Sequence, residues 1–303
     1  MRRDFLEKIR EVVGAERLYE AEPMSRHTTF RVGGPADVLV CPEYSELPQL
    51  IRLCRDCEIP YCVVGNGSNL LVGDGGIRGV VIELSKAMET VTIDGDYILA
   101  EAGALLSRVA NLAADHGLTG MEFAAGIPGS IGGAVVMNAG AYGGEMKDIV
   151  ESVTVLDREG TQKVLTAEQM EFGYRSSCVT EHGYTVMQSR LKLAAGDRDK
   201  IRQRMAELGE IRREKQPLEY PSAGSTFKRP EGYYAGKLIM DAGLRGYQVG
   251  GAQVSEKHCG FVINRGNATA GDIRRLMKDV SDEVQRQFGV SLEPEVKFLG
   301  SFE

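Results

Sequence analysis

The chain has 303 residues, of which 43% are hydrophobic and 26% charged, a composition typical of a folded protein and not of a disordered one. Its 36 Lys and Arg residues against 43 Asp and Glu residues give a net charge of −7, which argues against nucleic acid or an anionic membrane as a partner. At roughly 150 residues per domain, the length predicts about two domains.

The ends and the cysteines indicate a cytoplasmic protein with reduced thiols. Acidic residues stand near the N-terminus where a secretion signal needs an apolar run, and no stretch reaches the roughly 20 apolar residues that span a bilayer. Six cysteines are too few for a disulfide framework in this length. Cys54 and Cys57 have the spacing of a metal or redox pair, but no second pair completes a zinc site. We therefore expect ordinary thiols and no metal.

The first 85 residues alternate between helical and extended patterns. Apolar residues from Phe5 to Val13 follow helical spacing. Three strands are expected at 36–40, 61–65 and 79–84, and a helix at 45–57. This order predicts a βαβ-like unit.

Beyond residue 88 the pattern is richer in strands. Strands are expected at 90–93 and 97–100 around an Asp-Gly-Asp turn, and again at 150–157 and 184–193. A helix at 105–116 ends before Gly117. The polar helix expected at 197–215 marks a domain boundary.

The C-terminal segment predicts one long helix and a closing strand. Thr269 to Asp272 resembles a capping box, and apolar residues then recur at helical spacing until Gly289. Residues 290–299 read as a strand, which Pro294 restricts to an edge or to the strand's start.

Two glycine-rich segments are candidates for ligand binding. The loop Gly65-Asn66-Gly67-Ser68-Asn69 offers main-chain N–H groups for phosphate, but Leu70 stands where a Rossmann fingerprint needs glycine. Residues 125–143 hold several glycines and a proline, a poor helix and a poor strand that predict main chain close to a ligand. Alone, the loop at 65–69 is equally well explained as a turn between strands, and the alternative for the second segment is a compact packed turn. Together they favour an extended phosphate ligand such as a dinucleotide.

Three further motifs carry reactive side chains. Arg175 offers a planar fork for carboxylate or phosphate, although a lone arginine is usually a surface charge. Ser225 follows a glycine, but Phe227 breaks the Gly-x-Ser-x-Gly pattern of serine hydrolases. Glu293 and Glu295 share one face if their segment is extended, where they could also be edge charges that oppose aggregation.

In chain order these motifs closely resemble the UDP-N-acetylenolpyruvoylglucosamine reductases. The matching segments are TTFRVGGPAD at 28–37, VGNGSNL at 64–70, GIPGSIGG at 126–133, YRSS at 174–177, KQP at 215–217, GSTFK at 224–228 and LEPEV at 292–296. Each motif is modest alone, but the ordered combination is specific. The short stretch between Arg175 and Ser225 is similar to the family's smaller subgroup, which lacks an inserted tyrosine-bearing substrate loop.

The resemblance implies an α+β fold that binds FAD non-covalently. An FAD-binding module of the vanillyl-alcohol-oxidase (PCMH) type would occupy residues 1–195, in subdomains of about 1–85 and 86–195. A C-terminal α+β substrate-binding domain would occupy 196–303. The implied cofactor contacts are Thr29, Gly65, Asn66, Gly67, Ser68, Asn69, Leu70, Gly126, Ile127, Pro128, Gly129, Ser130, Gly132, Gly133 and Asn138.

The resemblance also implies the reaction, a step of peptidoglycan precursor synthesis. NADPH reduces the flavin, and UDP-N-acetylglucosamine enolpyruvate then takes the hydride at its vinyl carbon to give UDP-N-acetylmuramate. The developing enolate needs fixed hydrogen-bonding groups and a proton donor. Arg175 and Glu295 match the family's stabilising pair, and Ser225 matches its proton donor, which Lys215 or Glu295 would polarise. The substrate contacts that we expect are Tyr142, Arg212, Lys215, Lys228 and Asn264.

Two alternatives stay open on the sequence. An oxidase of the same fold would pass electrons to oxygen, and many such oxidases tether the flavin to a histidine, for which His27 is a candidate. A non-catalytic nucleotide or nucleotide-sugar binding protein would keep the glycine loops but has no reason to keep Arg175, Ser225 and Glu295. In either case the expected partners are small molecules, with no obligate protein partner.

Overall fold

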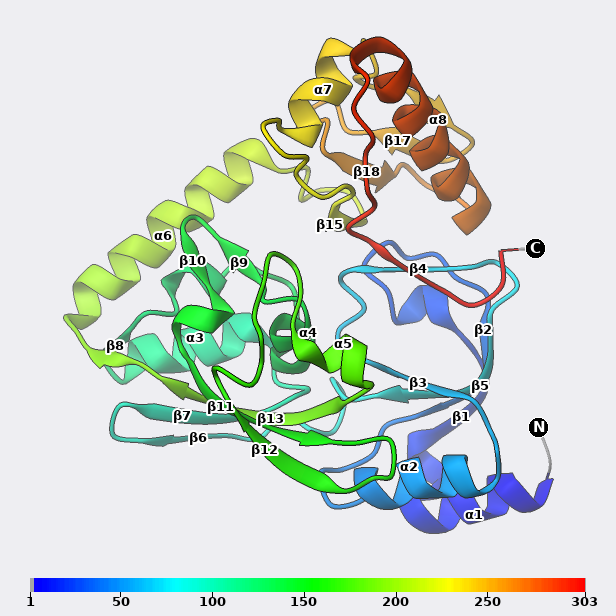
Figure 1. The fold of residues 1–303 in the computed structure, drawn as a ribbon, viewed down its shortest axis with the longest axis vertical. Coiled ribbons are helices and arrows are strands. Elements are labelled where there is room, and N and C mark those ends of the chain that lie inside the picture. Colours follow the sequence, from blue (N-terminus) through cyan, green and yellow to red (C-terminus); the bar gives the residue numbers. More distant parts are fainter. Residues whose placement is uncertain (1–2, 303) are drawn as a thin grey trace. The chain divides into compact units, whose positions relative to one another are not determined.

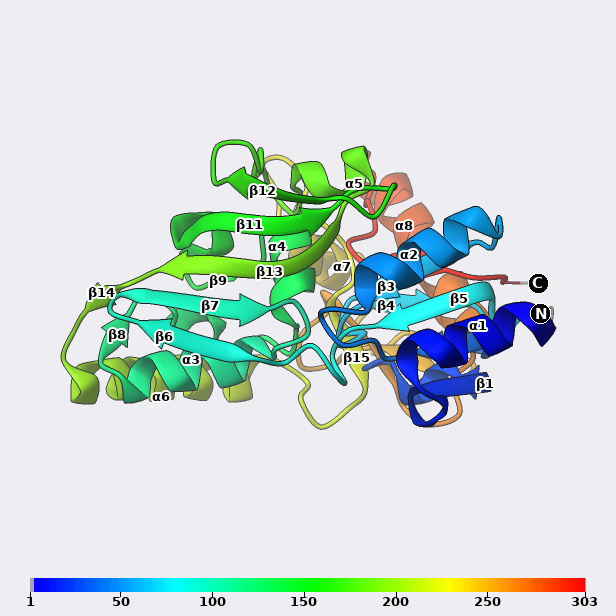
Figure 2. The ribbon, with the colours of Figure 1, turned by 90° about the horizontal axis from the view of Figure 1, so that it is seen from below.

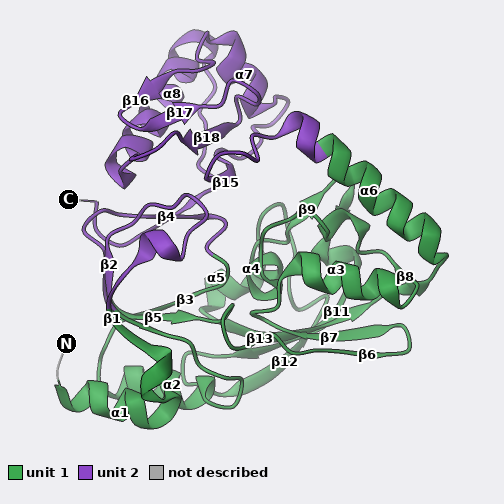
Figure 3. Cartoon of the chain, turned by 180° about the vertical axis from the view of Figure 1, so that it is seen from behind, with its two compact units in different colours: residues 1–20, 38–66, 79–211 green, residues 21–37, 67–78, 212–303 purple. Residues whose placement is uncertain are grey.

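The computed structural model describes residues 3–302, and the chain divides into two units (Figure 3). Unit 1 comprises Met1–Glu20, Val38–Asn66 and Gly79–Ile211. Unit 2 comprises Ala21–Asp37, Gly67–Arg78 and Arg212–Glu303. Two short N-terminal segments thus group with the C-terminal residues, and the division near residue 211 falls inside helix α6 (Arg198–Lys215). The expected domain boundary at residue 196 stays a prediction.

The N-terminal elements follow the expected βαβ-like order. Helices α1 (Arg3–Val13) and α2 (Leu47–Asp56) contact each other through apolar faces that include Phe5, Ile9, Leu50 and Ile51 (Figure 1). The sheet has the order β1-β2-β5-β3, with strands at Leu18–Pro23, Pro35–Val40, Ile77–Glu83 and Tyr61–Val64. Strand β5 pairs in parallel with β3 and lies between β2 and β3.

The second sheet of unit 1 has the order β12-β11-β13-β7-β6, and its strands lie side by side in Figure 2. They span Gln162–Thr166, Val150–Leu156, Thr185–Lys192, Tyr97–Glu101 and Val91–Asp94. All neighbouring pairs are antiparallel. Along β7, Ile98 and Ala100 are buried while Leu99 is exposed, so this strand has one core face. The strands expected here are confirmed.

Short elements complete unit 1. Helices α3 (Leu106–Asp115), α4 (Ile131–Val136) and α5 (Cys178–His182) lie between the strands in sequence, and α4 contacts β13 and β7. Two small antiparallel pairs join β8 (Leu118–Thr119) to β14 (Ala194–Ala195) and β9 (Gly140–Ala141) to β10 (Gly144–Glu145). The 3-10 helices among the described residues span Ala15–Arg17, Glu122–Ala124 and Met146–Asp148 in unit 1 and Met24–Arg26 in unit 2.

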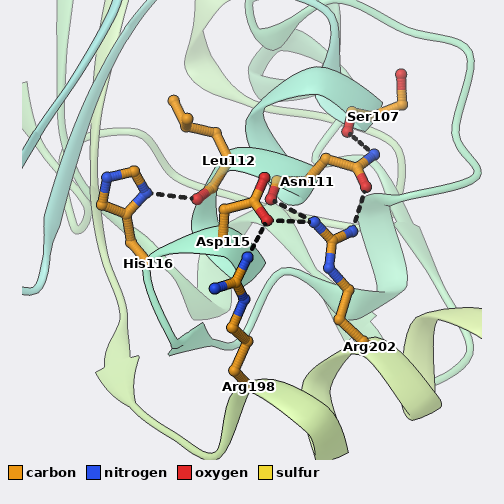
Figure 4. Close-up of polar contacts among 7 residues, drawn as sticks. All are labelled: Ser107, Asn111, Leu112, Asp115, His116, Arg198 and Arg202. Carbon is orange, nitrogen blue, oxygen red and sulfur yellow. Dashed lines mark hydrogen bonds and ion pairs between the residues drawn. The ribbon is translucent and has the colours of Figure 1, made fainter.

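The first turns of α6 are attached to α3 by a polar cluster (Figure 4). Arg198 and Arg202 both donate to Asp115, at 2.9 and 2.7 Å. Arg202 also donates to Asn111 Oδ1 at 2.6 Å, and Asn111 donates in turn to the Ser107 carbonyl at 2.7 Å. Hydrogen bonds from Arg202 and Arg198 hold the pKa of Asp115 below its usual value.

We expect Asp115→Asn to lower the urea midpoint of unfolding slightly at pH 7. A carboxyl group whose pKa is lower in the folded state stabilises the fold above its unfolded pKa of 3.8, and that contribution is lost as the pH falls through the folded pKa. The difference between wild type and variant should therefore be full at pH 7, should begin to fall near pH 3.8, and should be lost as the pH falls through the lower pKa of the folded state. Asp94→Asn, at an exposed hairpin position, is the control. A difference independent of pH would contradict the electrostatic origin.

Unit 2 is built on an antiparallel sheet of order β15-β18-β17-β16. Its strands span Ser222–Ser225, Phe261–Asn264, Ala252–Val254 and Gln248–Val249. Helix α8 (Ala270–Phe288) contacts β16, β17 and α7 (Ala235–Asp241). The expected capping box of Thr269 and Asp272 is confirmed, as is the C-terminal stop at Gly289, which has a φ of +69°. Each unit has its own hydrophobic core.

Two expectations from the sequence are wrong. The closing strand covers only β19 (Lys297–Leu299), which pairs in parallel with β4 (Leu70–Val72), and Pro294 forms an isolated bridge with Phe227. Proline has no N–H for a ladder, which explains the interruption. The glycine-rich segment contains a helix, α4, because Ser130 caps it. Within residues 3–302, no helix is long and apolar enough to cross a membrane.

Candidate active site

The loop after β3 leaves a row of main-chain donors available. Across residues 3–302, the N–H groups of residues 65–69 have no protein acceptor. Asn66 Nδ2 donates to the Pro128 carbonyl at 2.7 Å, so this loop is joined to the second glycine-rich segment within unit 1. Main-chain N–H groups without a protein partner can bind anionic oxygens, and the phosphate contacts expected for this loop stay a prediction.

Glycine is required in this loop because other groups approach it closely. A Cβ atom on Gly65 would lie 2.1 Å from Ser130 Oγ. A Cβ atom on Gly67 would lie 1.9 Å from the His27 carbonyl oxygen, and Gly67 has a φ of +61°. Only glycine allows this approach at positions 65 and 67, so neighbouring groups pack directly against the main chain there.

We expect Gly67→Ala to destabilise the protein and to weaken its retention of FAD. The new Cβ meets a main-chain carbonyl that cannot rotate away, in addition to the strain of a left-handed conformation, which is about 1–2 kcal/mol. Gly95→Ala is the matched control, because Gly95 has a φ of +56° and nothing within 4 Å of its Cβ position. Urea unfolding and flavin content after gel filtration measure the two effects. Equal shifts in both variants would show that the close contact with His27 is unimportant.

Thr29 presents a buried hydroxyl group beside the loop in unit 2. Its N–H donates to the Gly67 carbonyl at 3.2 Å, whereas its Oγ1 is buried and has no hydrogen-bond partner among the described residues. An unpaired buried hydroxyl is unfavourable by about 1–3 kcal/mol. A bound ligand with a polar group would satisfy it, which fits the expected cofactor role of Thr29.

The second glycine-rich segment has fewer free donors than expected. Ile131 N donates to the Ala104 carbonyl and Gly132 N to the Ala102 carbonyl, both at 2.8 Å. Gly133 N donates to Ser130 Oγ at 3.5 Å. A Cβ atom on Gly132 would lie 2.9 Å from the Ala102 Cβ. These glycines therefore allow close packing, and cofactor contacts from this segment stay a prediction.

Asn138 follows α4 and is almost completely buried, with 1% of its surface exposed. Its Nδ2 donates to Glu145 Oε2 at 2.7 Å and to the Gly173 carbonyl at 3.1 Å, and its Oδ1 accepts from Lys147 N at 2.9 Å. Protein groups thus occupy both ends of the amide. The expected cofactor contact of Asn138 stays a prediction.

Arg175 lies in a tight turn of unit 1. Gly173 and Ser176 exchange two main-chain hydrogen bonds, with N–O distances of 3.1 and 3.4 Å, so Tyr174 and Arg175 form the tip. Arg175 has a φ of +54°, which is unusual for a residue other than glycine. Its Nη2 donates to the Gly140 carbonyl at 3.5 Å, and its guanidinium lies 5.3 Å from the Tyr174 ring.

Ser225 and Glu295 are brought together in unit 2 through Thr226. Thr226 N donates to the Gly260 carbonyl, and the Thr226 carbonyl accepts from Glu295 N, both at 2.9 Å. Val262 N donates to the buried Thr226 Oγ1 at 2.9 Å. A register shift in β15 leaves Ser225 exposed next to this buried residue. The sequence did not single out Thr226, because its only signal there is its position next to Ser225.

The expected substrate contacts have different environments. Lys228 forms an ion pair with Glu293, and Lys215 is exposed at the end of α6. Asn264 is buried, and its Nδ2 donates to the Phe30 carbonyl at 3.0 Å. The other two expected contacts are Arg212, which is half-buried at the end of α6, and Tyr142, which is 41% exposed with a φ of +54°.

The cysteines are packed thiols, as expected. All six are free, and burial raises the pKa of Cys54 to about 12 and that of Cys62 to about 11, so both are protonated at neutral pH. Within the described residues, no group of three His, Cys, Asp or Glu side chains could hold a metal ion. His27, the candidate for a flavin tether, has its Nε2 3.0 Å from Glu22 Oε1.

Similar proteins cover the whole chain. Residues 35–166 match the FAD binding domain, and residues 216–299 match the C-terminal domain of UDP-N-acetylenolpyruvoylglucosamine reductase. A protein of that name from Agathobacter rectalis is 54% identical, with 100% of both chains covered. Another from Caldanaerobacter subterraneus subsp. tengcongensis is 53% identical, over 97% of this chain and 98% of its own.

A solved structure of a similar protein supports the same family. The crystal structure of the UDP-N-acetylenolpyruvylglucosamine reductase from Thermus caldophilus is 40% identical and superposes with a TM-score of 0.79. It covers 92% of this chain, and this chain covers 97% of it. The expected α+β fold, an FAD-binding domain followed by the family's C-terminal domain, is thereby confirmed. The chain belongs to the UDP-N-acetylenolpyruvoylglucosamine reductase family.

Proposed function

We propose that the protein reduces UDP-N-acetylglucosamine enolpyruvate to UDP-N-acetylmuramate with electrons from NADPH. The observation that carries this proposal is identity of 54% along the full chain to a reductase named for that substrate class. The matching FAD binding domain at residues 35–166 supports a flavin as the redox group. The product would be a precursor for peptidoglycan.

The chain's own groups would hold the cofactor. FAD supplies a hydride acceptor for NADPH and a hydride donor for the vinyl carbon of the substrate. The main-chain N–H groups of residues 65–69, which have no acceptor among the residues that the structure describes, would bind its phosphate oxygens. The buried Thr29 hydroxyl would gain a hydrogen bond that no group within residues 3–302 provides.

Three side chains would stabilise the developing charge and donate the proton in the second half-reaction. As the hydride reaches the vinyl CH₂ carbon, negative charge develops on the enolate of the substrate carboxylate. The Arg175 guanidinium would donate hydrogen bonds to that carboxylate, and Glu295, as the protonated acid, would donate a second hydrogen bond to it. The exposed Ser225 hydroxyl would give its proton to the adjacent carbon and be reprotonated from solvent. The net change is one hydride and one proton added across the double bond.

Anaerobic visible spectra of the purified protein test the proposal. NADPH should bleach the flavin absorbance, and UDP-N-acetylglucosamine enolpyruvate should restore it. Recovery only after air is admitted would favour the oxidase, and flavin retained on the precipitate after acid denaturation would show a covalent tether such as His27. No flavin signal after addition of FAD would favour the non-catalytic binding protein.

A further inference from the structure

We infer that Asn138 is a positioning residue that holds the Arg175 guanidinium in place for the enolpyruvyl carboxylate. This inference rests on the proposed function, because it concerns how the chain fixes the arginine assigned to that carboxylate. On this inference Asn138 acts only through Arg175 and touches neither the substrate nor the cofactor, which replaces the cofactor contact that the family resemblance implied, because protein groups occupy both ends of its amide. The argument depends on contacts within unit 1.

The turn that carries Arg175 needs external support. Arg175 occupies the third position of the four-residue turn Gly173–Ser176, with a φ of +54°. Turns with a positive φ at this position favour glycine or asparagine, because a Cβ atom is strained there. Such strain persists only where the surrounding structure holds the residue, and it gathers at functional sites.

The Asn138 amide supplies that support from a buried position. Its Nδ2 donates to the Gly173 carbonyl at 3.1 Å, which is the same carbonyl that accepts from Ser176 N. Asn138 itself has a φ of +40°, a conformation in which asparagine is several-fold enriched. The Ser177 hydroxyl adds a second tie by donating to the Val136 carbonyl of α4 at 2.9 Å.

The same amide also fixes the group that Arg175 contacts. The second Nδ2 bond, at 2.7 Å, reaches Glu145 on β10. Glu145 is the register partner of Gly140 on β9. The Gly140 carbonyl accepts from Arg175 Nη2 at 3.5 Å. A closed ring of contacts thus runs from Asn138 through the turn to Arg175 and returns through the β9–β10 pair.

This ring explains why an amide, and not another small polar group, stands at position 138. Two N–H bonds and one accepted bond are needed at the same place, and only Asn supplies them on so short a side chain. An aspartate here would bring a second carboxylate next to Glu145 and would leave the Gly173 carbonyl without this donor.

Asn138→Gly tests the inference, because glycine tolerates the positive φ and removes only the amide. Asn267→Gly is the matched control, an exposed asparagine with a φ of +56° in unit 2. We expect Asn138→Gly to slow flavin reoxidation by the enolpyruvyl substrate by about 10²-fold, the effect of a displacement of about 1 Å. Flavin reduction by NADPH, FAD affinity and the control should be unchanged.

A double-mutant cycle with Arg175→Ala separates positioning from general damage. If Asn138 acts through Arg175, then Asn138→Gly should have no further effect on reoxidation in the Arg175→Ala protein. Independent losses that multiply would overturn the inference. Slower reduction by NADPH or weaker FAD binding in Asn138→Gly would also overturn it, and would instead assign Asn138 to the cofactor.

A measurement that needs no catalytic turnover distinguishes failure of this inference from failure of the proposed function. Hydrogen exchange of the peptide covering residues 170–178 should be faster in Asn138→Gly than in Asn267→Gly, with or without FAD. A wild-type protein that does not reduce the substrate would refute the proposed function, while unchanged exchange would refute the support of the turn by Asn138. Should Asn138→Gly not fold, Glu145→Ala opens the ring at another contact. It should slow reoxidation by the enolpyruvyl substrate and leave reduction by NADPH and FAD affinity unchanged, and a wild-type reoxidation rate would overturn the inference.

Discussion

Replacing Ser225 with alanine is expected to slow flavin reoxidation by the enolpyruvyl substrate by about 10²–10⁴-fold, the usual contribution of a general acid. Flavin reduction by NADPH should stay nearly intact, because that half-reaction needs no proton at the substrate carbon. The variant should fold normally, since Ser225 is exposed and its buried neighbour Thr226 makes the contacts that hold the strand.

Stopped-flow absorbance under anaerobic conditions measures the two half-reactions of Ser225→Ala separately. Ser222→Ala is the matched control, because it makes the same change on the same strand, opposite Ile263. The control should behave as wild type in both half-reactions. Equal slowing of both half-reactions in Ser225→Ala would show that Ser225 is not the proton donor.

Arg175→Lys is expected to lower the reoxidation rate by about 10²–10³-fold, as for loss of one group that stabilises an oxyanion. Lysine keeps the positive charge but lacks the planar fork that can donate two parallel hydrogen bonds to a carboxylate. The strained φ of +54° is the same for both side chains, so the backbone contribution cancels in the comparison. The effect should appear in the rate at saturating substrate, because the charge develops only during the reaction.

Arg190→Lys is the control for the arginine-to-lysine change. Arg190 lies 4.1 Å from the Tyr97 ring and pairs with Glu151 at 2.8 Å, so it has an aromatic neighbour as Arg175 does, but on the open face of a sheet strand. Its replacement should leave both half-reactions unchanged. An Arg175→Lys protein that reoxidises at the wild-type rate would remove Arg175 from the charge-stabilising role.

The regular elements could be predicted well because their signals are local. The long helix α8 has apolar residues at helical spacing, a capping box at Thr269 and a glycine stop at Gly289, all within one stretch of sequence. The hairpin of β6 and β7 closes around Gly95, as the Asp-Gly-Asp turn predicted. By contrast, the sequence did not predict helix α4, because its glycines disfavour a helix locally. In the tertiary structure Gly132 of this helix packs tightly against Ala102.

The candidate site residues also divide into those that local motifs single out and those whose contacts only the tertiary structure reveals. Ordered motifs in the sequence identified the family and singled out Arg175, Ser225 and Glu295. They could not show that Asn138 has its amide bonded to Glu145 and Gly173, or that Thr29 has a buried hydroxyl with no hydrogen-bond partner in the described part of the chain. Each of these facts depends on which distant groups reach the residue.

Local patterns in the sequence therefore sufficed for the composition class, for most helices and strands, and for the family. Contacts between distant segments were needed to group residues 21–37 and 67–78 with the C-terminal unit, where β4 pairs with β19 and Asp74 accepts from Ala270 N and Gly271 N at the start of α8. The physical reason is how far apart along the chain the interacting residues lie. Helical spacing, capping and tight turns are set by neighbours along the chain, whereas these pairings join residues about 200 positions apart.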